Sequence, residues 1–415
     1  MSNMGITSLN IRRSFVVLTL TCLLLPFVFP GLWKVLIGEA HLGVLFLDTF
    51  AILSAADANA VGIDVFRFNP LDLLHRPHVY SSWWLLISHL GISRVHFLVV
   101  GACVSLLFVV AVLLIIIPRN YREFFIAFLC IYSPAALLAV ERANNDLIIF
   151  CLLALTPVLI NREDKTGLVG SWLIIFLSMG LKFYPVLCFL LILATSRSKR
   201  LKFWYIFSGC AATAVYLIHY LATFMLLRHT IPAPEYLLTI GGKLLFVHLG
   251  MPNRLAMLLT IIGFLLVLAC SCLWSRKQHC AGLCSLDSTG LEYFVLGSCV
   301  LLFCYFATSN YEYREIFFIL LLPFLFEKYR NKDIPAPVHN IIALQMYLIP
   351  LLMWSETLGR IGRYVYYMIF NTAPGLFWYF ILKDSLSWIV FSLLLCTCYC
   401  LYSNRPAVSR ETPPL

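Results

Sequence analysis

Apolar runs long enough to cross a lipid bilayer recur along nearly the whole of this 415-residue chain. A hydrocarbon core of roughly 30 Å needs about 20 apolar residues in a helix. The runs follow one another with only short polar loops between most of them, and charged residues make up 12% of the chain. That fraction is about half the share found in soluble domains. The pattern predicts an all-α, polytopic bundle of transmembrane helices.

Twelve spans are expected from the periodicity and length of these runs. They cover roughly residues 14–33, 95–117, 123–140, 146–160, 168–181, 184–195, 203–226, 254–274, 291–308, 315–326, 338–354 and 386–402. The stretch 361–383 is a thirteenth span, an interfacial helix or a re-entrant segment. We expect one transmembrane domain over residues 1–402 and a short disordered tail over 403–415.

Lysine and arginine residues orient these spans. They lie in alternate short loops, near residues 12–13, 119–122, 162–165, 197–202, 276–277 and 328–332. Such loops stay in the cytoplasm. We therefore expect a protein of the bacterial cytoplasmic membrane with a cytoplasmic N-terminus. The net charge of +10 is spread over these loops and indicates no nucleic-acid partner.

The first outer loop, residues 34–94, gathers an unusual share of the acidic residues. The chain has 20 aspartates and glutamates, and four of them fall within one 25-residue window: Asp48, Asp57, Asp64 and Asp72. Polar side chains at membrane depth are costly unless they are paired or hydrated, so they are candidate functional residues. Asp48 stands before a helix-like stretch and suits either an N-cap or a general base, two compatible roles. The paired tryptophans of the segment 83–90 predict a helix lying along the outer interface.

Three further polar clusters fall in the outer loops. The first is Glu-Arg-Ala-Asn-Asn-Asp over residues 141–146, where a continuous helix would pair Arg142 with Asp146 at i,i+4. Its alternative is a purely structural ion pair. The second contains Lys182, which either serves a site or extends its charge to the interface. The third contains Tyr313 and Arg314, donors that suit a phosphate.

Several functions lack the sequence features that they need. There is no Walker loop and no dinucleotide fingerprint, so an outward-facing enzyme would take its activated donor from a lipid. Cys280 and Cys284, after His279, are too few for a structural zinc site, which takes four ligands. We expect no metal and no cofactor.

These clusters resemble the GT-C superfamily of polytopic glycosyltransferases, and most of all glycosyltransferase family 87, which includes polyprenyl-phosphate-mannose-dependent α-mannosyltransferases. The matching elements are Asp48 followed by Gly62-Ile-Asp-Val-Phe66, then Asn69-Pro70 with Asp72, Arg76-Pro77 and Tyr80, then Glu141-Arg142-x-Asn144-x-Asp146, Lys182-x-Tyr184-Pro185 and Tyr313-Arg314. The chain departs from the family pattern at Ala143, which replaces a glycine, and at Val79, Ser81 and Glu315.

The resemblance implies a GT-C-type fold and an inverting enzyme with Asp48 as its base. It implies transfer of a hexose, with mannose as the first candidate, from a polyprenyl-phosphate-sugar to a lipid-linked or glycan acceptor. The implied donor-phosphate residues are Arg76, Arg142, Lys182, Tyr184, Tyr313 and Arg314, and the implied acceptor or sugar residues are Asp64, Asp72, Tyr80, Glu141, Asn145 and Asp146.

Two other functions remain open. One is a carrier or flippase for a lipid-linked sugar, although no internal repeat is evident. The other is a membrane acyltransferase, although no Ser/His/Asp arrangement stands out. The absence of a soluble partner domain fits a self-contained monomer that contacts its lipid substrates and the surrounding membrane lipids.

Overall fold

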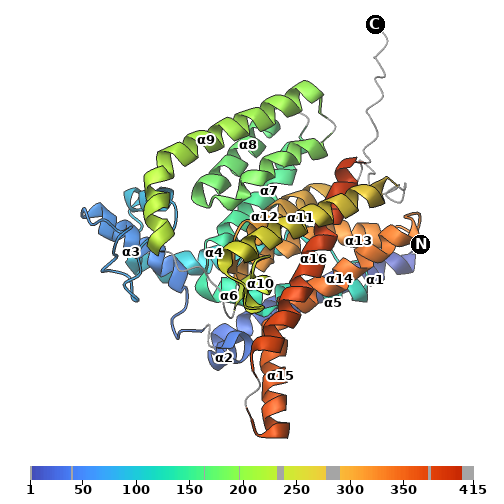
Figure 1. The fold of residues 1–415 in the computed structure, drawn as a ribbon, viewed down its shortest axis with the longest axis horizontal. Helices are drawn as coiled ribbons and strands as arrows, with labels where there is room; N and C mark the ends of the chain where they lie inside the picture. Colours follow the sequence, from blue (N-terminus) through green and yellow to red (C-terminus); the bar gives the residue numbers. More distant parts are fainter. Residues whose placement is uncertain are drawn as a thin grey trace.

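A computed structural model describes residues 2–38, 41–162, 164–195, 197–230, 238–276, 290–372 and 375–403 (Figure 1). The expected tail beyond residue 403 and the stretch from His279 to Cys284 lie outside the described residues. Within these ranges the chain is almost entirely helical, as predicted. The elements are α1 (Ser2–Val28), α2 (Gly31–Ile37), α3 (Leu47–Ala60), η2 (Ser82–Leu90), η3 (Arg94–His96), α4 (Phe97–Ile115), α5 (Tyr121–Ile131), α6 (Pro134–Arg142), α7 (Asp146–Ile160), α8 (Lys165–Leu181), η4 (Tyr184–Ala194), α9 (Lys199–Thr230), β1 (Thr239–Ile240), α10 (Leu244–His248), α11 (Asn253–Ser275), α12 (Leu291–Ala307), β2 (Asn310–Tyr311), η5 (Glu312–Leu321), α13 (Leu322–Arg330), α14 (Ala336–Met353), α15 (Ser355–Phe370) and α16 (Phe377–Ser403), where η marks a 3₁₀ helix.

Six described segments are long and apolar enough to cross a membrane, which indicates an integral membrane protein. They lie within α1, η3–α4, α9, α11, α14 and α16, and α5 with α6 makes a seventh if a pair bent by 47° counts as one span. Twelve or thirteen spans were expected, and five of them are formed by shorter helices: α7, α8, η4, α12 and the pair η5 and α13. A 15-residue helix such as α7 is only about 23 Å long, less than the hydrocarbon thickness.

The breaks between helices follow from capping residues and prolines. Ser133 accepts a hydrogen bond from the Ala136 amide at 3.2 Å, and Pro134 occupies the first turn of α6, where its missing N–H costs nothing. Asp164 caps α8 in the same way through the Gly167 amide at 2.7 Å. The expected span 123–140 is thus the bent pair α5–α6, and its bend brings the end of α6 to the polar residues described below.

The helices pack around a core that extends from Phe15 to Leu401. Helix α12 packs against η4 and η5, α7 against α4 and α8, and α16 against α11 and α14. In Figure 1, α9 lies along the upper edge of this bundle, α3 at its left end, and α15 projects from the bottom. The short strands β1 and β2 pair antiparallel, with Thr239 opposite Tyr311.

Loops predicted to lie on the same side of the membrane do contact one another. Arg330 pairs with Glu123 at 2.8 Å, and Arg122 bonds the Tyr329 hydroxyl, joining the basic loops before α5 and after α13. Arg197 donates to the carbonyl of Arg162, joining two more basic loops. These contacts join four of the basic loops in two pairs.

Two expected features of the outer surface differ. The segment 82–90 is helical, as η2, but its tryptophans pack inward: Trp84 is 8% exposed and donates to the Leu181 carbonyl at 3.2 Å, while Trp83 contacts Phe176 and Tyr216. Aromatic side chains have as much to gain from protein packing as from lipid headgroups. The stretch 361–383 is neither one span nor one interfacial helix, because it contains the end of α15 and the start of α16.

Candidate active site

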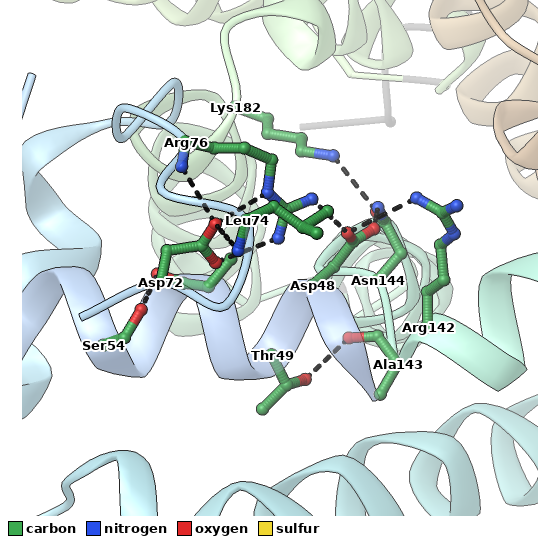
Figure 2. Close-up of polar contacts among 11 residues, drawn as sticks. Asp48, Thr49, Ser54, Asp72, Leu74, Arg76, Arg142, Ala143, Asn144 and Lys182 are labelled. Atoms are coloured by element: carbon green, nitrogen blue, oxygen red, sulfur yellow. Dashed lines mark hydrogen bonds and ion pairs between the residues drawn. The ribbon is translucent and has the colours of Figure 1, made fainter. Parts of the chain in front are cut away.

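The first turn of α3 is fixed against the corner between α6 and α7. The Phe46 amide donates to the Glu141 carbonyl at 2.7 Å, and the Thr49 hydroxyl donates to the Ala143 carbonyl at 2.8 Å. Phe46, which precedes α3, is in the left-handed region with φ 60°. These bonds bring Asp48 to residues about 100 positions later in the chain (Figure 2).

Asp48 is not the cap of its helix, so the capping role considered for it is wrong. It is the second residue of α3, the capping position is Phe46, and no side chain caps the first turn. One Asp48 oxygen, Oδ2, accepts a hydrogen bond from Asn144 Nδ2 at 2.6 Å. The other, Oδ1, lies 3.9 Å from Arg76 Nη1 and 3.8 Å from Arg142 Nη1, beyond hydrogen-bond distance. Among the described residues, the buried carboxylate thus has one hydrogen-bonded oxygen and one oxygen that lies near two guanidinium groups without a hydrogen bond.

Arg76 is held in place by Asp72 through a two-pronged ion pair. The bonds run from Nε to Oδ2 at 2.9 Å and from Nη2 to Oδ1 at 3.1 Å. The backbone amides of Leu74 and Arg76 also donate to Oδ2, at 3.1 and 3.0 Å. Burial alone raises the pKa of Asp72, but the hydrogen bonds and charge of Arg76 outweigh burial and leave this pKa below its ordinary value. Asp72 is therefore an orienting residue for Arg76.

The corner between α6 and α7 breaks the helix that the sequence pattern assumed. Ala143 adopts φ 42° and ψ 52°, which ends α6 at Arg142, and α7 begins at Asp146. The expected i,i+4 pair of Arg142 with Asp146 is therefore wrong: Arg142 faces Asp48, and Asp146 faces Lys182.

Asp146 anchors the second half of the cluster. It pairs with Lys182, accepts a hydrogen bond from the Tyr184 hydroxyl at 2.7 Å, and lies 3.6 Å from Arg314 Nε. Lys182 is 8% exposed, so its charge is stabilised by these groups rather than at an interface. The two cations reach Asp146 from the end of α8 and from η5, segments far apart in the chain.

Aromatic rings surround the Lys182 ammonium. Its Nζ lies 5.3 Å from the ring centre of Tyr80, 5.7 Å from that of Tyr313 and 5.9 Å from that of Tyr184. The Arg314 guanidinium lies 5.0 Å from the Tyr184 ring. Cation–π contacts of this kind partly replace the water that a buried cation loses.

Asn144 joins the side chains around Asp48 to those around Asp146, and it was not among the residues expected in the site. Its Nδ2 donates to Asp48, while its Oδ1 accepts from Lys182 at 3.2 Å and from the Asp146 amide at 2.9 Å. Its neighbour Asn145 was expected in the site instead. Asn145 is 2% exposed, and neither of its amide atoms has a partner among the described residues. The signal for Asn144 was present in the Glu-Arg-x-Asn-x-Asp pattern, but only the tertiary placement of α3 separates the two asparagines.

Two other expected residues lie apart from this cluster. Glu141 is buried and pairs with His41, with 2.7 Å between Oε1 and Nδ1. Asp64 has an exposed side chain and pairs with Arg67 at 3.1 Å. The structure does bring together eleven residues, which we call the Asp48 cluster: Asp48, Asp72, Arg76, Tyr80, Arg142, Asn144, Asp146, Lys182, Tyr184, Tyr313 and Arg314.

The Asp48 cluster carries four cations and three carboxylates. The four cations of this aromatic-lined site are the groups that suit an anionic ligand. In the part of the chain that the structure describes, no three histidine, cysteine or acidic side chains are grouped to hold a metal ion.

No protein-family model, curated protein or solved structure matches this chain.

Proposed function

We propose that the protein is a membrane glycosyltransferase that moves a hexose from a polyprenyl-phosphate-sugar to a hydroxyl of a lipid-linked or glycan acceptor. Mannose is the first candidate for the hexose. The observation that carries the proposal is the arrangement around Asp48. Among the described residues, one oxygen of the buried Asp48 carboxylate lies outside hydrogen-bond distance of the nearby guanidinium groups, and several cations lie on neighbouring loops. This arrangement supplies a base and an anion site within one cluster.

In the proposed reaction Asp48 Oδ1 accepts the proton of the attacking hydroxyl. The acceptor oxygen forms a bond to the anomeric carbon as the bond from that carbon to the phosphate oxygen breaks, with inversion. The electron pair leaves on the polyprenyl phosphate. Positioned general bases contribute about 10²–10⁴-fold to such reactions. Asn144 fixes Oδ2, so that Oδ1 keeps its direction toward the acceptor.

The departing phosphate gains negative charge and needs cations nearby. Lys182 and Arg314 are proposed to receive it, with Arg142 and Arg76 between the phosphate and Asp48. Tyr184 and Tyr313 add hydroxyl donors. Lys182 and Arg314 both contact Asp146, which keeps them in place before the lipid arrives. The chain uses Asp72 to orient Arg76, and Tyr80 packs on Lys182.

The experiment is sugar transfer in proteoliposomes with radiolabelled polyprenyl-phosphate-mannose and a lipid extract as acceptor. Asp48→Asn keeps the shape of the side chain and removes the base. Asp333→Asn is the matched control, because it makes the same change on an exposed side chain to which no role in the site is assigned. We expect a loss of about 10²-fold or more for Asp48→Asn and wild-type transfer for Asp333→Asn.

Equal transfer by wild type and Asp48→Asn would contradict the role of Asp48. If no protein transfers mannose while the labelled lipid crosses the bilayer, the carrier alternative replaces the enzyme.

A further inference from the structure

A second polar feature lies away from the Asp48 cluster, at a cavity between α14, α15 and α16. The cavity has a volume of about 700 Å³, within the range of pockets that bind small molecules. Its walls are mostly apolar and include Leu351, Leu358, Trp378 and Leu382. These four side chains are 44–71% exposed, so the cavity opens onto an apolar surface of the protein. A ligand that enters here has a large hydrocarbon part.

Two cations line the same cavity, and their charges are balanced differently. Lys383 is buried and pairs with Glu312 and with Glu356, the latter at 2.8 Å. Arg363 has no ion-pair partner in the described parts of the chain. Its guanidinium lies 5.1 Å from the centre of the Tyr379 ring, and its Nη1 is buried without a hydrogen-bond acceptor there. A buried donor without an acceptor is costly, so this nitrogen indicates a ligand that supplies one.

The acceptor that best fits an arginine beside apolar walls is a lipid phosphate. A guanidinium presents paired donors that match phosphate oxygens, and it is less strongly hydrated than an ammonium. We propose that the cavity between α14, α15 and α16 binds one anionic membrane phospholipid, with Arg363 contacting its phosphate and the apolar walls contacting its chains. This site is additional to the glycosyl-transfer site proposed above.

The sugar donor is the less suitable occupant of this cavity. Lys383 is already paired with Glu312 and Glu356, and their carboxylates repel a phosphate that approaches this cation. Arg314, two residues after Glu312, points instead to Asp146 in the Asp48 cluster. A donor phosphate therefore has its own cations elsewhere, and the carboxylates separate the two anion sites.

Gly362 offers a way to close the cavity without disturbing the fold. It lines the cavity on α15, its φ is not in the left-handed region, and a Cβ placed on it meets no atom within 4 Å. Gly362→Phe therefore places a bulky ring in the cavity, and Arg363→Gln removes the cation. Gly31→Phe is the matched control, because Gly31 on α2 has the same open surroundings outside the cavity. Size-exclusion chromatography of each variant is the control for folding.

The test is native mass spectrometry of the detergent-purified full chain after delipidation, titrated separately with phosphatidylglycerol, phosphatidylcholine and undecaprenyl phosphate. We expect one tightly held phosphatidylglycerol per wild-type chain, bound about tenfold more tightly than phosphatidylcholine. Arg363→Gln is expected to weaken phosphatidylglycerol by about tenfold or more, and Gly362→Phe to remove the bound lipid. Gly31→Phe should bind as wild type does.

Equal binding of the two phospholipids by wild type, or full retention by Gly362→Phe, overturns the proposal. If wild type binds undecaprenyl phosphate more tightly than phosphatidylglycerol, and Gly362→Phe loses that binding, the proposal is overturned. The cavity would then bind the polyprenyl phosphate of the sugar donor. None of these results depends on sugar transfer, so the proposed function and this site fail independently.

Discussion

Asn144 and Asn145 offer a direct test of the hydrogen bonds around Asp48, because these two adjacent asparagines are similarly buried but differently bonded. Asn144→Ala removes three hydrogen bonds: one to the Asp48 carboxylate, one from the Lys182 ammonium and one from the Asp146 amide. Bonds to charged groups contribute about 1.5–3 kcal/mol each, and a neutral bond about 1 kcal/mol. Since the three share one side chain and do not add fully, we expect a loss of about 3–5 kcal/mol.

Asn145→Ala removes an amide of the same size that makes no hydrogen bond among the described residues. We therefore expect unchanged stability or a gain of up to about 1 kcal/mol, because a buried polar group without partners is unfavourable. The assay is thermal unfolding of both variants in one detergent. Asn144→Ala should have the lowest apparent Tm, and Asn145→Ala should match or exceed wild type. The reverse order would refute the bonding pattern around Asp48.

Three more predictions follow from single residues. Asp72→Asn should lower the free energy of unfolding by about 2 kcal/mol, because it removes the carboxylate that pairs with Arg76. Since the pKa of Asp72 is below its ordinary value, the difference from wild type should persist across neutral pH and vanish in acid. Thermal unfolding measured as a function of pH checks both. Burial lowers the pKa of His78 from 6.5 to about 4, so the folded state excludes its proton and wild type should lose stability as pH falls from 6.5 to 4, by about 3 kcal/mol at most; His78→Gln should flatten that slope in the same assay. Ala143→Gly should keep or raise the Tm, because Ala143 has φ 42°. Ala139→Gly within α6 should lower the free energy of unfolding by about 1 kcal/mol and with it the Tm, and a Tm loss at residue 143 would contradict the left-handed corner.

Much of the polar cluster could be located from sequence because the sides of the loops are determined locally. Lysines and arginines mark one set of loops, and the remaining loops, with Asp48, Asp146, Lys182 and Arg314, do meet in the structure. The helical class followed in the same way from the apolar runs. Neither inference needs knowledge of which helix packs on which.

The pairing of residues could not be predicted, because it depends on backbone geometry between elements. The i,i+4 rule paired Arg142 with Asp146 by assuming that the helix continues, but Ala143 turns it. Choosing between Asn144 and Asn145 requires the position of α3. That position is determined by the hydrogen bonds that the Phe46 amide and the Thr49 hydroxyl donate. The lengths of the individual helices were not predictable either, since apolarity alone does not separate a full crossing from a short helix buried among others.

The distances along the chain between partners set an order for biogenesis. At about 5–20 residues synthesised per second, Lys182 follows Asp146 within seconds, but Arg314 follows it by roughly 10–30 s. During that interval Asp146 has Lys182 as its only charged partner in the cluster. Chains truncated before η5 would therefore retain a charged pocket without its last cation, and they should be more readily degraded than chains truncated after it.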